Sequence, residues 1–223
     1  MKVPEFKRDL LRYLDWCKRE LSTFDVDIRT GCEATADLVL KENPNVTIIA
    51  TGSKPIIPEL PGLEKEIIVS AMDLLLGRKR AGRNVLVLGG GLIGCETALW
   101  LAQQGKKVVI SEILKDVLSS GIPVQHMNRL MLLDLLRFHG VEINTSISSW
   151  ELADGGLLLL NGNSQKKFVK ADTIVVSVGM KSQQDLYSAL RAELPNLFLI
   201  GDSRKPQNVM NAVWDAYEVS RMI

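Results

Sequence analysis

Residues 87–96, VLGGGLIGCE, contain four glycines, of which Gly89, Gly91 and Gly94 have the spacing Gly-x-Gly-x-x-Gly. This spacing binds a pyrophosphate when it joins a strand to a helix. The first glycine permits a tight turn, the second lets the backbone approach the phosphates, and the third lets helix and strand pack closely. The unpaired N–H groups at the start of the helix then face the anion. We therefore expect a nucleotide phosphate to be bound by Gly89, Gly90, Gly91, Leu92, Ile93 and Gly94.

An acidic residue indicates which nucleotide is bound. Glu112 lies 21 residues after Gly91, at the end of the apolar run KVVISE. A carboxylate at this place can accept hydrogen bonds from the hydroxyls of the adenosine ribose, and it would repel a 2′-phosphate. No arginine follows it, so we expect NAD rather than NADP. The alternative is a glycine-rich turn without a ligand, with Glu112 as a surface carboxylate.

Two further side chains follow the glycines directly. A thiol at a helix N-terminus can become reactive, but Cys95 sits beside the closest contact of helix and strand, so we expect it to serve packing. Glu96 is expected in the first helical turn, where it either complements the helix dipole or faces the nicotinamide end of the cofactor. The sequence leaves both roles open for Glu96.

The segments around the motif alternate between strands and helices. The expected strands and helices are 84–89, 91–104, 107–112, 124–139, 141–144 and 173–179. Two antiparallel strands, 150–160 and 166–169, are expected around a turn NGNS. This order predicts an α/β fold with a Rossmann-like three-layer domain.

The flanking segments have a different pattern. Helices are expected at 6–21, at 71–76 and from about 208, and short strands at 26–29, 46–50 and 197–201. The stretch from Gly77 to Gly82 holds the basic run 78–80, which we interpret as a solvated linker at a domain boundary.

Composition narrows the function classes. The chain has 223 residues, 46% hydrophobic and 24% charged, with a net charge of +1, so no nucleic-acid or anionic-membrane partner is indicated. Its three cysteines form no CxxC pair and it has two histidines, so no disulfide framework, thiol redox centre or metal site is expected. No signal peptide or spanning apolar run is found, and a cytoplasmic location is expected.

The residues as a whole resemble a known family. VLVLGGGLIGCETALWLAQQGKKVVISE is similar to the NADH-binding domain of flavoprotein reductases with two dinucleotide-binding domains. VTIIATGSKPIIPELPG resembles their hinge segment, and LFLIGDSRKPQNVMNAVWDAYEVSRMI resembles the segment that closes over the flavin. The ending, and the opening VPEFKRDLLRYLDWCKREL, are similar to NADH:flavin oxidoreductases of the enoate reductase and 2,4-dienoyl-CoA reductase type, relatives of trimethylamine dehydrogenase.

This resemblance implies roles for individual residues. Thr51 and Gly52 would pass beside FAD, and Gly201 would place the carboxylate of Asp202 at its ribityl or phosphate side. The alternative for Asp202 is a role in turning the following loop. The helix that includes Val209 would point its N-terminus at the pyrimidine edge of the flavin, and Gly179 would approach the nicotinamide of NAD. No catalytic acid or base is nominated, because direct hydride transfer needs none.

One feature departs from the family pattern. The family begins its FAD domain with a second Gly-x-Gly-x-x-Gly, and none precedes residue 85. We therefore expect a fragment, with a complete NAD(H)-binding domain at 81–194 inserted in an incomplete FAD-binding domain at 1–80 plus 195–223. FMN and an iron–sulfur cluster would belong to a region upstream. Apolar surface left by the absent unit would favour self-association.

Two functions follow as hypotheses. In the first, the chain is the module of an NADH-dependent flavoprotein oxidoreductase that passes a hydride from NADH to FAD, for reduction of a substrate such as an enoate or enoyl thioester. In the second, it is a nucleotide-binding module, for NAD or ADP, without turnover. An ordinary dehydrogenase is disfavoured because no substrate domain is found.

Overall fold

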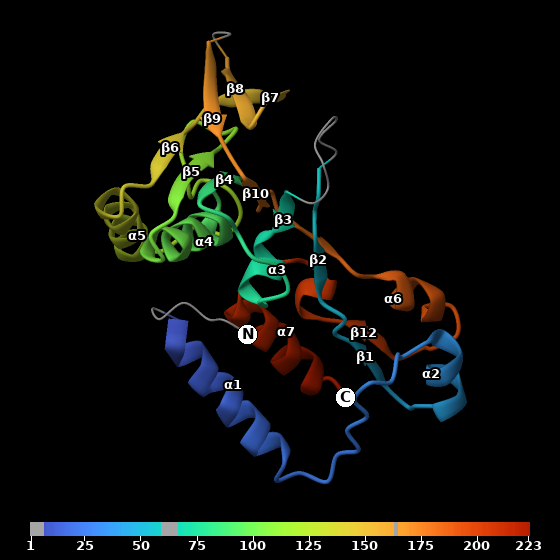
Figure 1. The fold of residues 1–223 in the computed structure, drawn as a ribbon. Coiled ribbons are helices and arrows are strands. Elements are labelled where there is room, and N and C mark those ends of the chain that lie inside the picture. Colours follow the sequence, from blue (N-terminus) through green and yellow to red (C-terminus); the bar gives the residue numbers. More distant parts are fainter. Residues whose placement is uncertain (1–6, 59–66, 163–164) are drawn as a thin grey trace. The chain divides into compact units, whose positions relative to one another are not determined.

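A computed structural model describes residues 7–58, 67–162 and 165–223 (Figure 1). The chain divides into two compact units, Lys54–Lys181 and the described part of Lys2–Ser53 together with Ser182–Ile223. The start of the first expected helix and the last two residues of the NGNS turn lie outside the described residues. Within these ranges no helix is long and apolar enough to cross a membrane.

The first unit is built on a parallel sheet with the strand order β3-β10-β4-β5-β6. Its strands are β3 (Ile68–Ser70), β4 (Asn84–Leu88), β5 (Lys107–Ser111), β6 (Glu142–Asn144) and β10 (Thr173–Val176). In β4, Val85 and Val87 belong to one core cluster while Leu86 and Leu88 belong to another. Both faces of the sheet are therefore buried, as expected for strands that are apolar throughout.

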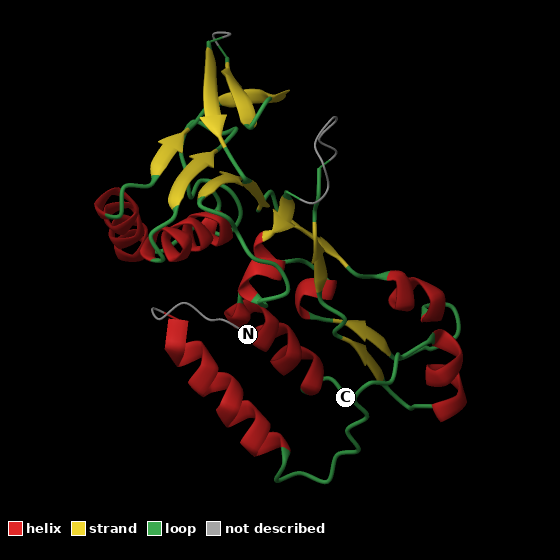
Figure 2. Cartoon of the chain, viewed as in Figure 1, coloured by secondary structure: helices red, strands yellow, loops and turns green. Residues whose placement is uncertain are grey.

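A layer of structure covers each face of this sheet (Figure 2). The first cluster takes side chains from α3 (Ala71–Leu75), α4 (Leu92–Gln103) and α5 (His126–Phe138). The second takes them from an antiparallel sheet of β7 (Ile147–Ala153), β8 (Gly156–Asn161) and β9 (Lys166–Lys170). The prediction of an α/β, Rossmann-like three-layer unit is confirmed.

The expected strand 150–160 is wrong, because the chain reverses within it. β7 pairs with β8, and the register places Ala153 opposite Gly156. The reversal at Asp154 and Gly155 uses a glycine with φ +72°. An Asp-Gly pair is a common two-residue hairpin turn, since its second residue readily takes a positive φ. The sequence thus contains the turn signal, but the run of leucines that follows it made the whole segment resemble a single strand.

The second unit is smaller and mostly helical. Its elements are α1 (Arg8–Leu21), α2 (Ala36–Glu42), β1 (Thr47–Ile49), α6 (Asp185–Leu190), β12 (Leu197–Leu199), a 3₁₀ turn at Gly201–Ser203 and α7 (Val209–Ser220). β1 and β12 pair in parallel. β2 (Ser53–Pro55) and β11 (Met180–Ser182), where the chain passes from unit to unit, form a separate two-stranded sheet.

The expected strand at 26–29 is wrong as well. The structure assigns no strand to these residues, and the side chains that alternate there, Val26 and Ile28, are 52% and 56% exposed. An alternating pattern forms a strand only where another strand is present to pair with it.

The segment from Gly77 to Gly82 does not separate the two units. It lies inside the first unit, because β3 precedes it and pairs with β10 in the parallel sheet. The Nζ atom of Lys106 also donates to the carbonyl oxygens of Ala81 and Gly82, at 2.7 and 2.8 Å. The division thus falls after Ser53 and after Lys181, earlier than the expected positions 81 and 194.

Candidate functional site

The glycine motif forms a loop between β4 and α4 in the first unit. Gly91 is the N-cap of α4, and no side chain makes a capping hydrogen bond there. The N–H groups in the first turn of a helix lack partners within the helix, and together with the helix dipole they favour an anion. The loop therefore has the local structure of a phosphate site.

Close packing within the unit accounts for three of the four glycines. A Cβ atom on Gly89 would lie 2.3 Å from the carbonyl oxygen of Ser177, and one on Gly94 would lie 2.0 Å from that of Gly89. A Cβ on Gly90 would lie 2.6 Å from Cγ1 of Val117. None of these distances is compatible with a side chain.

Gly91 differs from the other three. Its φ of −68° and ψ of −179° are open to any residue. Apart from its neighbours in the chain and in α4, the only atom of the described residues within 4 Å of a Cβ built on it is the Oγ of Ser120 at 3.4 Å, an ordinary contact. The folded chain does not itself require glycine here. A glycine whose missing side chain leaves open space fits a backbone that a ligand approaches closely.

Glu112 follows β5 and reaches back to the glycine loop. Its Oε2 accepts from the N–H of Gly90 at 2.6 Å, and its Oε1 accepts from the N–H of Leu114 at 2.8 Å. The residue is 6% exposed, so the alternative of a surface carboxylate is wrong. Each carboxylate oxygen has a second lone pair, which leaves the group able to accept from ribose hydroxyls.

Cys95 serves packing, as expected. It is fully buried, and its Sγ donates to the carbonyl oxygen of Gly90 at 3.3 Å. Burial, and secondly the negative charge of Glu112, raise the pKa of the thiol to about 12. Cys95 is thus an uncharged thiol at neutral pH. The expected place of Glu96 is corrected, because α4 begins at Leu92 and Glu96 lies beyond its first turn.

Sequence reasoning missed a group of residues beside the loop. The carbonyl oxygen of Gly90 accepts from the N–H of Leu118 at 2.7 Å, so the segment after β5 crosses the loop. Ser177 follows β10, and its N–H donates to the carbonyl oxygen of Leu88 at 2.8 Å. The only available signal was the position of Ser177 directly after a buried strand, since the ends of neighbouring parallel strands meet at one edge.

Gly179 lies in the same unit, two residues beyond Ser177. It has φ +128°, and its carbonyl oxygen accepts from the N–H of Ile56 at 3.0 Å. Its approach to a nicotinamide stays a prediction.

Asp202 belongs to the second unit, in the 3₁₀ turn after β12. Its Oδ2 accepts from Oγ of Ser53 at 3.0 Å, and its Oδ1 accepts from the N–H of Gln207 at 3.1 Å. These bonds help to turn the following loop, and the role of Asp202 beside FAD stays a prediction. Gly201 has φ +60°, and its N–H donates to Oδ2 of Asp215 at 2.9 Å.

The other predicted flavin residues are also in the second unit. Oγ1 of Thr51 donates to the carbonyl oxygen of Gln183 at 2.8 Å. The N–H of Gln183 donates to the carbonyl oxygen of Gly52 at 3.0 Å. Val209 is the first residue of α7 and is 51% exposed. Asn208 caps that helix by accepting from the N–H of Asn211 at 3.0 Å. The structure thus places in one unit all five residues to which the resemblance assigns the flavin.

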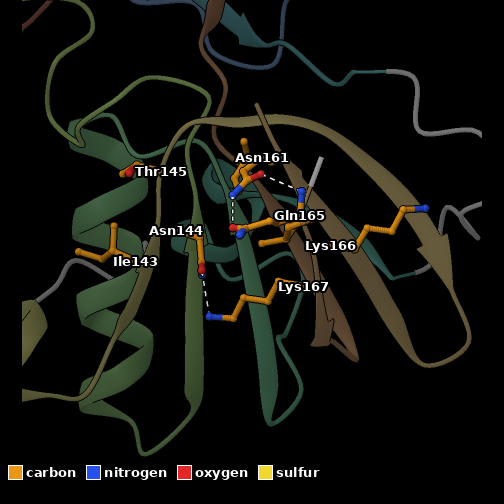
Figure 3. Close-up of a pocket in the computed structure, with 9 residues that line it drawn as sticks. Ile143, Asn144, Thr145, Asn161, Gln165, Lys166 and Lys167 are labelled. Atoms are coloured by element: carbon orange, nitrogen blue, oxygen red, sulfur yellow. Dashed lines mark hydrogen bonds between the residues drawn. The ribbon is translucent and has the colours of Figure 1, made fainter. Parts of the chain in front are cut away.

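A separate cavity of about 660 Å³ lies at β6 and the antiparallel sheet (Figure 3). It contains none of the predicted site residues. Two pairs of its polar side chains are hydrogen-bonded: Nζ of Lys167 donates to Oδ1 of Asn144 at 3.0 Å, and Nδ2 of Asn161 donates to Oε1 of Gln165 at 3.0 Å (Figure 3).

Known proteins resemble this chain over nearly its full length. It is 40% identical over 221 residues to cinnamate reductase from Clostridium sporogenes, covering 99% of this chain and 33% of that protein. It is 30% identical over 216 residues to NADH oxidase from Thermoanaerobacter brockii, covering 95% of this chain and 33% of that protein. A solved structure of 2-naphthoyl-CoA reductase matches with a TM-score of 0.90 and 27% identity, covering 99% of this chain and 33% of the other.

The chain spans about a third of the length of these relatives. A family profile described as pyridine nucleotide-disulphide oxidoreductase matches residues 41–216, which include both the glycine loop and the Gly201–Asp202 turn. The chain therefore belongs to the pyridine nucleotide-disulphide oxidoreductase family.

Proposed function

We propose that the first unit binds NADH. The observation that carries this proposal is the open space at Gly91, on a loop whose other glycines are required by packing. The N–H groups at the start of α4 would hold the pyrophosphate, and Glu112 would accept from the adenosine ribose. Gly179 would lie toward the nicotinamide.

We further propose that the second unit contributes to an FAD site through Thr51, Gly52, Gly201, Asp202 and Val209. NADH would supply a hydride and FAD would accept it, and this cofactor chemistry needs no side-chain acid or base. Residues of this chain would bind and orient the two dinucleotides. The complete protein would then reduce an enoate or enoyl thioester, a proposal supported by the names cinnamate reductase and 2-naphthoyl-CoA reductase among its relatives.

A second candidate is nucleotide binding without turnover by this chain alone. One observation favours it: the motif Gly-x-Gly-x-x-Gly occurs once in the 223 residues, whereas two dinucleotides need two phosphate sites. FMN and an iron–sulfur cluster would belong to other parts of a longer protein. A cytoplasmic location and self-association stay predictions.

Calorimetric titration of the chain with NADH and with NADPH tests the proposed site. We expect NADH to bind at least about tenfold more tightly, because the carboxylate of Glu112 would lie close to a 2′-phosphate. ADP-ribose should compete with NADH, since the expected contacts are with the pyrophosphate and the adenosine. Equal affinities would contradict the role of Glu112, and no binding of either nucleotide would contradict the proposed function.

A further inference from the structure

The segment after β5, residues 113–120, forms a strap over the glycine loop. The N–H of Leu118 donates to the carbonyl oxygen of Gly90 at 2.7 Å. Val117 is 2% exposed, and its Cγ1 fills the space that a side chain on Gly90 would need. The strap and the glycine loop therefore pack as one structure.

The fold holds this strap in one conformation. Leu118 has φ +58°, a conformation that is costly for a residue with a Cβ and persists only where its surroundings impose it. Leu118 is 6% exposed, so its side chain is anchored in the core. From α5, Nη2 of Arg129 donates to the carboxylate of Asp116 and, at 3.3 Å, to the carbonyl oxygen of Val117. The two residues that precede Leu118 are thereby held in place.

Ser120 follows this fixed turn and faces the phosphate end of the loop. Its Oγ lies 3.4 Å from the position that a Cβ on Gly91 would occupy, at the N-cap of α4. The residue is exposed, and its hydroxyl has no hydrogen-bond partner among the described residues. The neighbouring hydroxyl differs, because Oγ of Ser119 donates within the strap to the carbonyl oxygen of Val117 at 3.4 Å.

We propose that Ser120 is a ligand of the dinucleotide pyrophosphate, with its hydroxyl donating to a phosphate oxygen across the loop from the N–H groups of α4. This inference rests on the proposed function of the first unit. A hydroxyl donor to a charged oxygen is a strong type of hydrogen bond. Arg129 would be a positioning residue that acts through the strap.

The test compares Ser120→Ala with the matched control Ser119→Ala. In competition against NADH fluorescence, we expect Ser120→Ala to weaken binding of ADP-ribose about ten- to hundredfold, the usual loss for one hydrogen bond to a charged group. Binding of adenosine, which has no phosphate, should not change. Ser119→Ala should bind both probes like the unaltered chain, and Ser120→Thr, which keeps a hydroxyl, should restore the affinity for ADP-ribose.

The possible outcomes separate the two proposals. If NADH binds but Ser120→Ala leaves the affinity for ADP-ribose unchanged, the inference is wrong and the proposed function stands. An equal loss for adenosine and ADP-ribose would also overturn it, because Ser120 would then act on the nucleoside. If the unaltered chain binds no NADH, the proposed function fails first.

Discussion

At the scale of single residues, the four positions of the loop are glycine for different physical reasons. Gly89, Gly90 and Gly94 are required because neighbouring atoms occupy the space of a side chain. Gly91 is compatible with a side chain in the folded chain, so the proposed ligand would explain its identity. Folding therefore accounts for three glycines of the motif, and the proposed binding accounts for the fourth.

The pair Gly91→Ala and Gly94→Ala tests this distinction. Gly91→Ala should change the free energy of unfolding by less than about 1 kcal/mol, an N-cap effect, and weaken NADH binding at least about tenfold. Gly94→Ala should lower the free energy of unfolding by about 1–3 kcal/mol, because its Cβ would overlap the carbonyl oxygen of Gly89. Thermal denaturation and calorimetry measure the two effects, and a stable Gly94→Ala variant would contradict the steric account.

Glu112 stabilises the folded loop in addition to its proposed role in binding the ribose. Glu112→Ala would leave the N–H groups of Gly90 and Leu114 without their acceptor. We expect the free energy of unfolding to fall by about 1–3 kcal/mol, the cost of unsatisfied buried donors, and NADH binding to weaken as well. Urea denaturation measures the first effect. Glu112→Gln keeps one acceptor oxygen and should lose less stability. Unchanged stability in both variants would contradict the stabilising role of Glu112.

At the scale of elements, α7 is tied to the turn that carries Asp202. The carboxylate of Asp215 accepts from Nε of Arg204 at 2.9 Å and from the N–H of Gly201 at 2.9 Å. The Arg204 guanidinium is the main reason that the pKa of Asp215 lies below its usual range. A helix side chain thus fixes the backbone of the Gly201–Ser203 turn.

This contact predicts a dependence of local stability on pH. A carboxyl group with a lower pKa in the folded state stabilises the fold above its ordinary pKa of about 4, and the stabilisation is lost as the pH falls through the folded value. Hydrogen exchange at the Gly201 N–H should therefore accelerate relative to the intrinsic rate below about pH 4. Asp215→Asn should show weaker protection at neutral pH and no such acid transition. Identical profiles for the two proteins would contradict the assignment.

The strands show a similar dependence on partners. The alternation at 26–29 forms no strand, whereas the three residues of β1 form one because β12 lies beside them. The run 150–160 divides into two strands because Gly155 takes a positive φ. Local pattern indicates which segments can be strands, and pairing decides which segments are.

At the scale of the whole molecule, the two units contain different sets of the predicted cofactor-binding residues. The first contains the glycine loop and Glu112, and the second contains Thr51, Gly52, Gly201, Asp202 and Val209. The sequence has one glycine-rich phosphate motif, and it belongs to the first unit.

This asymmetry predicts how the chain behaves when it is purified. We expect a colourless protein that binds NADH and retains no stoichiometric FAD, because a dinucleotide without a phosphate loop loses its main anion contacts. The absorbance spectrum of the purified chain, and release of flavin on denaturation, measure this directly. Stoichiometric FAD would show that the second unit binds it without a second motif.

Much of the site was available from the sequence alone. The glycine spacing, the acid at the end of KVVISE and the alternation of apolar strands with helices determined the three-layer unit, the loop and Glu112. These features are local, because a turn, a helix start and a strand end each depend on residues close together in the chain.

Only the tertiary structure decided what surrounds the loop. Leu118, Ser120 and Ser177 reach it because the ends of β5 and β10 lie beside the end of β4. Pairing within the same sheet places β3 in the first unit. The two units therefore divide after Ser53 and after Lys181, and not at the positions expected from the sequence. Strand order joins residues that are distant in sequence, and no local pattern encodes it.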